Sequence, residues 1–356
     1  MNKKLTYLLP LLMLVACTEN AGDEVIGLAP YTLSVDNTEI ESDGKQMATF
    51  KITDANGTVL TDNEELMSKI WFKNEETGHR LTGKTKIFRS VEDGEYTFSA
   101  TFSGNPCENT VTVKSKNRSH YEVFKKNVCI YRLTATWCQY CPDMTKALER
   151  VSDWTKSRIV ELDLHASGST FALSNGAKYI ADGLKDNFKT GGYPSCVYDL
   201  DVVLGSVIYS DHEEKVFDRI SEVPATCGIK ASSTYVDGVL SLQASLISST
   251  GGKYDIGYAL LVDGLDGGAG AYEKVYDNTV VAISGNYEYL STAAQELEMN
   301  QEAKIVDLSQ SVGLPSSAKA SDCSLVVFAL KQNGNDVDID NVVKFPLGGS
   351  VDYIYN

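Results

Sequence analysis

Two cysteines separated by two residues constrain the fold of this chain more than any other feature. Cys138 and Cys141 follow Trp137 and precede Pro142 in the run Ala-Thr-Trp-Cys-Gln-Tyr-Cys-Pro. Eight cysteines in 356 residues would give a CxxC spacing roughly 0.18 times by chance, and one with a preceding Trp roughly 0.0015 times. An apolar run at 128–133 predicts a buried strand before the pair, and a stripe at helical spacing follows it, at positions 144, 147, 148, 151 and 154.

The start of that predicted helix is a favourable place for a reactive thiol. Unpaired backbone N–H groups and the positive end of the helix dipole stabilise a thiolate, so we expect Cys138 to ionise more readily than a free cysteine. Cys138 would attack a substrate disulfide and Cys141 would resolve the mixed disulfide, which requires no diffusible cofactor because the electrons reside in the pair. The alternative is a structural disulfide, or a cysteine pair retained on a non-catalytic scaffold. A metal site would need two further ligands, and the chain has no second CxxC and no HxxxH.

The rest of segment 121–224 alternates between strands and helices. The patterns predict a strand at 159–164, a helix over 173–188, a hairpin of 196–200 with 202–204, and a last helix capped by Asp211. The order β-α-β-α-β-β-α is that of an α/β thioredoxin-like layer.

These motifs resemble a known family. Residues 121–224 resemble a thioredoxin-fold domain, and 121–356 resembles the twenty-eight-kilodalton outer-membrane protein family of Gram-negative lipoproteins. The resemblance rests on the run 137–142, on His165, on Gly192-Tyr193-Pro194 and, more weakly, on Tyr276-Asp277-Asn278.

The resemblance implies that Pro194 is a cis-proline that faces the disulfide, and that the backbone of Tyr193 pairs with a substrate chain. Two departures stand out. Arg132 occupies the position of a buried Asp in thioredoxin, and Gln139-Tyr140 replaces its Gly-Pro.

The candidate site therefore has a catalytic and a substrate-binding part. Cys138, Cys141 and Pro194 are the expected catalytic residues. The expected substrate contacts are Trp137, Gln139, Tyr140 and Tyr193. His165 is an auxiliary candidate, either as a proton shuttle beside the disulfide or as a packed or solvated residue at a strand end.

The other cysteines leave several pairings open. Cys129 and Cys196 fall on neighbouring predicted strands, as buried free thiols or as a second disulfide. Cys227 and Cys323 are a further candidate pair, and Cys107 then has no identified partner in the sequence.

The flanking segments are predicted to be β-rich. Residues 31–116 alternate apolar and polar positions around Asn-Gly and Asp-Gly turns, which indicates an antiparallel sandwich, and they resemble bacterial immunoglobulin-like domains. Residues 227–356 return to alternation and predict a C-terminal antiparallel β-sandwich. The fold class is thus multidomain, with an α/β unit between two β-sandwiches. Trp71 and Trp154 are expected in cores.

The N-terminus indicates export. Residues 1–16 combine two lysines with a short apolar run, as in a signal peptide, and Leu-Val-Ala before Cys17 resembles a bacterial lipoprotein box. Lipid on Cys17 would anchor the chain to a membrane of the cell envelope, the outer membrane by the resemblance, and 17–30 would be a flexible tether. No later run approaches 18 apolar residues, so no membrane-spanning helix is expected.

Two functions follow as hypotheses. The first is thiol–disulfide exchange on exported proteins with thiols or disulfides, together with a redox partner that recycles the pair. The second is a non-catalytic binding or structural lipoprotein of the surface or outer membrane. The net charge of −16 disfavours nucleic acid as a partner in either case.

Overall fold

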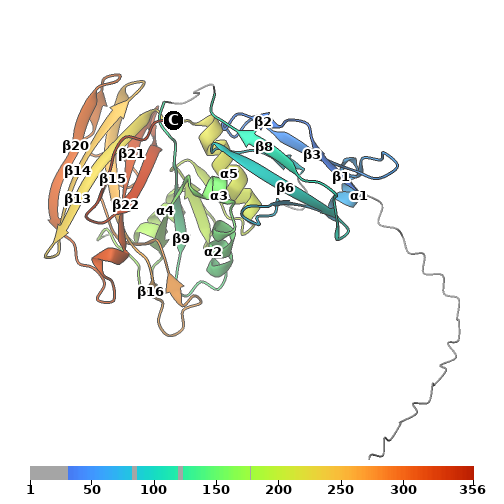
Figure 1. The fold of residues 1–356 in the computed structure, drawn as a ribbon. Coiled ribbons are helices and arrows are strands. Elements are labelled where there is room, and N and C mark those ends of the chain that lie inside the picture. Colours follow the sequence, from blue (N-terminus) through green and yellow to red (C-terminus); the bar gives the residue numbers. More distant parts are fainter. Residues whose placement is uncertain (1–30, 82–85, 119–122, 177) are drawn as a thin grey trace, which may run out of the picture.

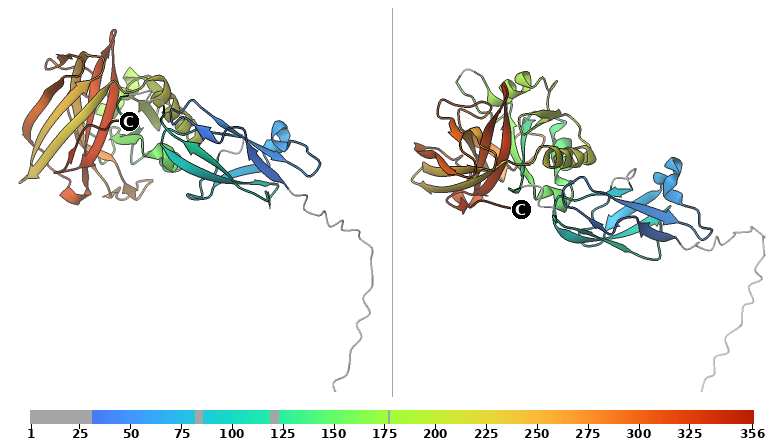
Figure 2. Two further views of the ribbon diagram at one scale, coloured as in Figure 1. Left: turned by 45° about the horizontal axis from the view of Figure 1, so that its top comes forward. Right: turned by 90° about the horizontal axis from the view of Figure 1, so that it is seen from above.

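The computed structural model describes residues 31–81, 86–118, 123–176 and 178–356 (Figures 1 and 2). The expected signal peptide 1–16, Cys17 and the tether to residue 30 lie outside these ranges. Within them, none of the helices has the length and apolar character needed to cross a membrane.

The N-terminal sandwich (31–118) consists of two facing sheets. One contains β1 (Thr32–Val35), β3 (Ala48–Thr53) and β5 (Ile87–Phe88). The other contains β2 (Glu39–Ile40), β8 (Val111–Ser115), β6 (Gly94–Phe102), β4 (Ile70–Asn74) and β7 (Asn105–Pro106). A 3-10 turn at Leu60–Asp62 and the short helix α1 (Glu64–Met67) follow β3. Alternate side chains meet in the core, where the Phe50 ring lies 5.0 Å from those of both Phe72 and Phe98.

The expectation that Trp71 lies in this core is wrong. Burial alternates along β4, so Ile70 and Phe72 face inward while the Trp71 side chain is 41% exposed. The Arg80 guanidinium lies over the Trp71 ring, 5.4 Å from its centroid.

The central segment (123–224) is a sheet covered by helices on both faces. Its strands are β9 (Val128–Thr134), β10 (Ile159–His165), β11 (Ser195–Tyr198) and β12 (Val202–Leu204). Its helices are α2 (Cys141–Glu149), α3 (Asp153–Lys156), α4 (Ile180–Asn187) and α5 (Tyr209–Glu222). Every residue of β9 is buried, because one face packs with α2 and α5 and the other with α4. β10 runs parallel to β9, and β11 runs antiparallel to it.

Three helix predictions differ from the structure. The helix after the cysteines ends at Glu149, and the segment with Trp154 forms the separate helix α3. Ser152 precedes α3, and its hydroxyl donates a hydrogen bond to Glu213 of α5. The stripe at 173–188 is helical only from Ile180, because the preceding residues form turns. Asp211 does not cap α5 but lies in its first turn, where it accepts a hydrogen bond from Ser206.

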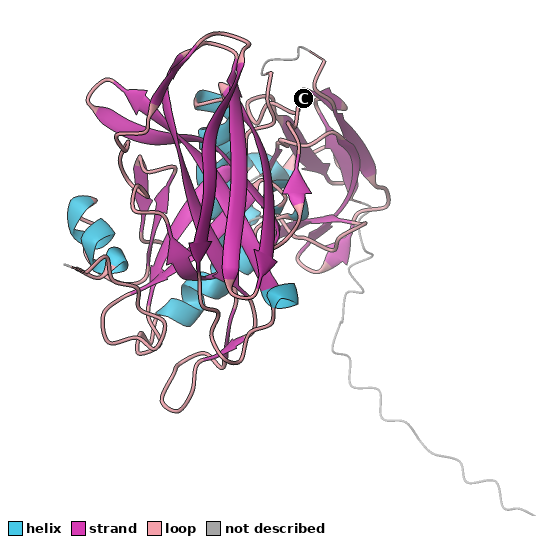
Figure 3. Cartoon of the chain, turned by 90° about the vertical axis from the view of Figure 1, so that its left-hand side faces the viewer, coloured by secondary structure: helices cyan, strands magenta, loops and turns pink. Residues whose placement is uncertain are grey.

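The C-terminal sandwich (227–356) has long strands, seen face-on in Figure 3. One sheet is made of β20 (Glu302–Ser311), β14 (Val239–Ser248), β13 (Cys227–Val236) and β23 (Ser350–Val351). The facing strands are β15 (Gly252–Val262), β18 (Thr279–Ile283), β19 (Gln295–Leu297), β21 (Cys323–Asn333) and β22 (Asp336–Pro346). A 3-10 turn (Ala320–Asp322) precedes β21, and β16 (Leu265–Asp266) and β17 (Val275–Tyr276) form a small hairpin.

The central and C-terminal segments share one sheet, in the order β12-β11-β9-β10-β18-β15-β21-β22. The junction is a parallel pairing of β10 with β18, in which the Asp163 N–H donates to the Asn278 carbonyl oxygen at 2.9 Å. A shared core reinforces it, since the Tyr131 hydroxyl donates to the Tyr287 carbonyl oxygen at 2.8 Å. The segments on either side of 224–227 thus share one sheet, and β18 covers what would otherwise be the open edge of β10.

The N-terminal sandwich packs against α3 and α5 of the central segment (Figure 2). Trp154 of α3 is 5% exposed, and its ring lies 5.5 Å from those of Phe88 and Tyr96. The expected burial of Trp154 is confirmed, and its ring joins two segments that the sequence predicts as separate units.

Candidate functional site

The two motif cysteines form a disulfide at the N-terminus of α2. Cys141 is the first residue of this helix and Pro142 follows in its first turn, where the missing N–H of proline has no helical partner to lose. The Cys141 N–H donates to the Cys138 carbonyl oxygen at 3.3 Å. In the reduced protein, Cys138 would therefore lie in front of the free N–H groups of α2, which favour negative charge.

The sulfur pair is shielded, but the residues beside it are exposed. Cys138 is 5% exposed and Cys141 is 1% exposed. Gln139 is exposed, as are the large rings of Trp137 (47%) and Tyr140 (61%). Aromatic surface therefore surrounds the shielded sulfur atoms.

The loop before β11 lies against the disulfide. The Tyr193–Pro194 peptide bond is cis, as the family resemblance implied. Tyr193 packs against the small cluster that contains both cysteines, and its ring is perpendicular to that of Trp137 at a centroid distance of 5.9 Å.

Two hydrogen bonds fix these aromatic rings. The Tyr193 hydroxyl donates to Asp182 of α4 at 2.5 Å, and the Trp137 indole N–H donates to the Ser167 carbonyl oxygen at 3.0 Å. Burial, followed by the bond to Asp182, raises the pKa of Tyr193, so its hydroxyl stays protonated as a donor. The structure thus brings together the predicted residues Trp137, Cys138, Cys141 and Tyr193, with Pro194 next in the chain.

His165 lies at the end of β10 in an aromatic pocket. Its Nδ1 is 2.7 Å from the Ser169 hydroxyl, and its ring lies 5.2 Å from those of Phe171 and Tyr276. Burial lowers the pKa of His165 to about 4, so the imidazole is neutral near pH 7. This placement favours the packed alternative over the proton shuttle.

A buried ionic group beneath α2 escaped the sequence interpretation. Arg132 is 3% exposed, its Nε lies 2.7 Å from Glu161 Oε1 and 2.7 Å from Asp163 Oδ1, and its guanidinium also contacts Thr145 of α2. Burial and the neighbouring Asp163 charge raise the pKa of Glu161 to about 8. The sequence contains a sign of this group, because Arg132 interrupts an apolar predicted strand and the next predicted strand carries Glu161 and Asp163 at alternate positions.

The β16–β17 hairpin of the C-terminal sandwich reaches the loop before α2. The Tyr272 N–H donates to the Thr136 carbonyl oxygen at 3.1 Å, directly before Trp137. Burial raises the pKa of the neighbouring half-buried Glu273. Of the weaker motif at 276–278, Tyr276 packs on His165, and Asn278 accepts the hydrogen bond from β10 described above.

The remaining cysteines of the described ranges are free thiols. Cys129, Cys196 and Cys227 are buried, and desolvation raises the pKa of each, so the second disulfides considered from the sequence are not formed. Cys323 and the half-buried Cys107 are also free, and burial raises the pKa of both to about 11. Within the described residues, no group of three or more His, Cys, Asp or Glu side chains is arranged to hold a metal ion.

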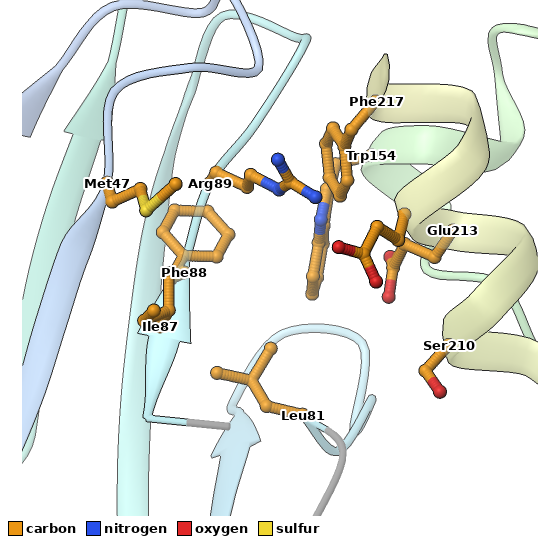
Figure 4. Close-up of a pocket in the computed structure, with 10 residues that line it drawn as sticks. Met47, Leu81, Ile87, Phe88, Arg89, Trp154, Ser210, Glu213 and Phe217 are labelled. Carbon is orange, nitrogen blue, oxygen red and sulfur yellow. The ribbon is translucent and has the colours of Figure 1, made fainter. Parts of the chain in front are cut away.

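A pocket of about 240 Å³ lies elsewhere, between the N-terminal sandwich and α5 (Figure 4). Phe88, Trp154 and Phe217 line it together with Arg89 and Glu213, and none of the predicted site residues does. The Arg89 guanidinium lies 4.6 Å from the centroid of the Phe217 ring.

Comparisons with known proteins concern the fold. No protein-family model matches the chain, and no curated protein matches it. The chain is similar to the solved structure of HBP35 of Porphyromonas gingivalis, with 18% identity and a TM-score of 0.51 over 63% of this chain and 76% of that one. It is also similar to a protein of Agrobacterium tumefaciens, with 15% identity and a TM-score of 0.40 over 63% of this chain and 96% of that one. This chain is therefore a β-rich protein of several sheets that has the fold of HBP35 over that shared region.

Proposed function

We propose that this protein is an exported thiol–disulfide oxidoreductase whose central segment is thioredoxin-like. One observation supports the proposal above all. The Cys138–Cys141 disulfide lies at the N-terminus of α2, next to the loop with the cis Tyr193–Pro194 bond. No diffusible cofactor is required, because the pair itself stores two electrons.

In the reducing direction, the Cys138 thiolate attacks one sulfur of a substrate disulfide. A mixed disulfide forms, and the other substrate sulfur leaves as a thiolate that takes a proton. Cys141 then loses its proton and attacks the Cys138 sulfur, which releases the second substrate thiol and restores the Cys138–Cys141 disulfide. The substrate disulfide is reduced and the cysteine pair is oxidised, and a separate redox partner must reduce the pair again.

The exposed surface supports a polypeptide substrate. Trp137 and Tyr140 offer large rings beside the sulfurs, Gln139 offers an amide between them in the chain, and Tyr193 packs against the cluster that contains both cysteines. Pro194 would hold the backbone of its loop in a shape that can pair with an extended substrate chain.

We also propose that a lipid anchors the protein to a membrane. Lipid on Cys17 after removal of 1–16 would keep the protein at a membrane of the cell envelope, where exported proteins carry disulfides. Replacing Cys17 by Ala should move the protein from the membrane fraction to the soluble fraction, and an unchanged distribution would reject the anchor.

The second candidate is a binding or structural lipoprotein. The low exposure of Cys138, 5%, and the two β-sandwiches favour it, because a shielded pair on a β-rich scaffold can serve structure alone.

Reduction of insulin disulfides by dithiothreitol separates the two candidates. The wild-type chain should accelerate the reaction, Cys138→Ala should abolish the acceleration, and Cys107→Ala, which removes a half-buried free thiol elsewhere, should leave it intact. Equal rates with wild type and Cys138→Ala would favour the binding candidate.

A further inference from the structure

The β16–β17 hairpin of the C-terminal segment is anchored to the chain that follows β10. Its buried Tyr276 ring lies 5.2 Å from the ring of His165 and 5.6 Å from that of Phe171, measured between centroids. His165 is the last residue of β10 and is opposite Thr134 at the end of β9. The hairpin therefore packs at the end of the sheet from which the cysteine loop leaves.

A second contact fixes Tyr272 of this hairpin beside the cysteine pair. The Tyr272 N–H donates to the Thr136 carbonyl oxygen at 3.1 Å, and the Thr136 N–H donates to the Ser169 hydroxyl, also at 3.1 Å. Thr136 is buried and immediately precedes Trp137 and Cys138. The hairpin thus reaches the backbone that leads into the disulfide.

The loop that carries Tyr272 is closely packed. The Gly267 N–H donates to the Lys274 carbonyl oxygen at 3.0 Å. A Cβ on Gly267 would lie 2.6 Å from both the Glu273 carbonyl oxygen and the Tyr276 ring, so the two sides of the loop meet where only glycine fits. Contacts within the loop and with the cysteine loop therefore set the position of the Tyr272 backbone.

The Tyr272 side chain is the exposed part of this arrangement. It is 57% exposed, and Trp137 and Tyr140 of the cysteine loop are exposed to a similar extent. Single exposed aromatic side chains are common, but exposed apolar surface gathered in one place marks a site of interaction. A tyrosine has only two side-chain torsions, so on a fixed backbone it provides a large contact area at a low cost in conformational entropy. The hairpin thus adds an exposed ring from another segment to the surface beside the disulfide.

Resting on the proposed function, we propose that Tyr272 is a substrate-contact residue, supplied to the cysteine site by the C-terminal segment. Its ring binds the substrate on the Trp137 side of the cysteines. The favoured substrates are extended, non-native polypeptides with an aromatic or large apolar side chain close to their own cysteine. In a folded protein such side chains are buried, and the shielded sulfurs of Cys138 and Cys141 are reached more easily by an extended segment than by a folded surface.

The first experiment measures binding without any redox step. The oxidised full chain is titrated into fluorescently labelled α-lactalbumin that has been reduced and carboxymethylated, an unfolded chain without free thiols, and fluorescence anisotropy gives the dissociation constant. We expect Tyr272→Ala to weaken binding about two- to tenfold, the worth of one aromatic contact, and Tyr272→Phe to bind like wild type. Alanine keeps the backbone N–H that bonds to Thr136, so this contact of the hairpin remains.

Tyr355→Ala is the matched control for this loss of a ring. The Tyr355 side chain is also exposed, and it lies next to the C-terminus, which is at the other end of the molecule from β16 in Figure 1. This variant should bind the unfolded chain like wild type.

The second experiment measures selectivity among disulfides. Reduction driven by dithiothreitol is followed for a short peptide whose disulfide is flanked by phenylalanine, for the same peptide with serine instead, and for bis(2-hydroxyethyl) disulfide. Tyr272→Ala should raise the KM for the phenylalanine peptide about two- to tenfold without lowering kcat, because it removes a contact present in both the ground state and the transition state. The other two disulfides lack the aromatic side chain and should react as with wild type.

Equal affinities and equal KM values for wild type and Tyr272→Ala would overturn the proposal. An equal loss with all three disulfides would also overturn it, because that result indicates a structural role. A wild type that binds the unfolded chain through Tyr272 but reduces none of the disulfides would reject the oxidoreductase and support the contact.

Discussion

Trp154 offers the sharpest test of how the segments of this protein hold together. Its side chain leaves α3 of the central segment and enters a ring of aromatic side chains from the N-terminal sandwich. The ring centroids lie 5.2 Å from His79, 5.5 Å from Phe88 and Tyr96, and 6.4 Å from Phe98, with interplanar angles between 74° and 80°. Edge-to-face contacts of this kind add to the gain from burying the ring itself.

We expect Trp154→Ala to lower the free energy of unfolding by about 3–5 kcal/mol, the cost of truncating a fully packed aromatic side chain. Trp71→Ala is the matched control, because Trp71 is 41% exposed and its main contact is the Arg80 guanidinium. That variant should lose less than about 1 kcal/mol. Urea unfolding followed by far-ultraviolet circular dichroism measures both. If Trp154→Ala lost no more stability than Trp71→Ala, the shared core would not exist as described.

Three further changes test other parts of the structure. Burial lowers the pKa of His165 to about 4, so wild type should lose about 3 kcal/mol of stability as the pH falls from 6.5 to 4. His165→Phe should remove this loss. Urea midpoints at pH 7.5 and 4.5 measure it, and an equal difference between the two midpoints in wild type and variant would contradict the prediction. Gly257→Ala should destabilise by about 1–3 kcal/mol or more, because a Cβ there would lie 2.0 Å from the Phe328 ring, and a melting temperature like that of wild type would contradict this. Lys126→Met should cost about 1–3 kcal/mol. The buried Lys126 ammonium lies 3.1 Å from the Asp199 carboxylate, which keeps Arg219 as a partner, but the carbonyl oxygens of Ile339 and Asp340 would lose their donor. An unchanged melting temperature would contradict these contacts.

Local patterns in the sequence predicted local structure well. The apolar run at 128–133 is the buried β9, the hairpin of 196–200 with 202–204 forms as β11 and β12, and the disulfide begins a helix. These elements depend on residues close together in the chain, whose periodicity and turn chemistry are visible in the sequence. The cis bond before Pro194 followed from family resemblance, because the local sequence does not determine the isomer.

Long-range pairing explains what the sequence did not reveal. Nothing near Asp163 indicates that its strand pairs with one more than a hundred residues later, and nothing near Tyr272 indicates its hydrogen bond to Thr136. The helix after the cysteines also stops earlier than its apolar spacing suggests, because Ser152 bonds with Glu213, sixty-one residues away. Such contacts are set by tertiary packing, which overrides helix propensity.

The pairing of β10 with β18 makes the central segment dependent on strands of the C-terminal segment. A fragment that stops near residue 224 would leave the backbone donors and acceptors along one edge of β10 unpaired. Such an exposed strand edge promotes edge-to-edge aggregation of the fragment. The fragment would also lack the Tyr272 N–H that donates to the Thr136 carbonyl oxygen beside the cysteine pair. Grafting the cysteine pair with its surroundings onto another protein would therefore require the downstream β-strands as well.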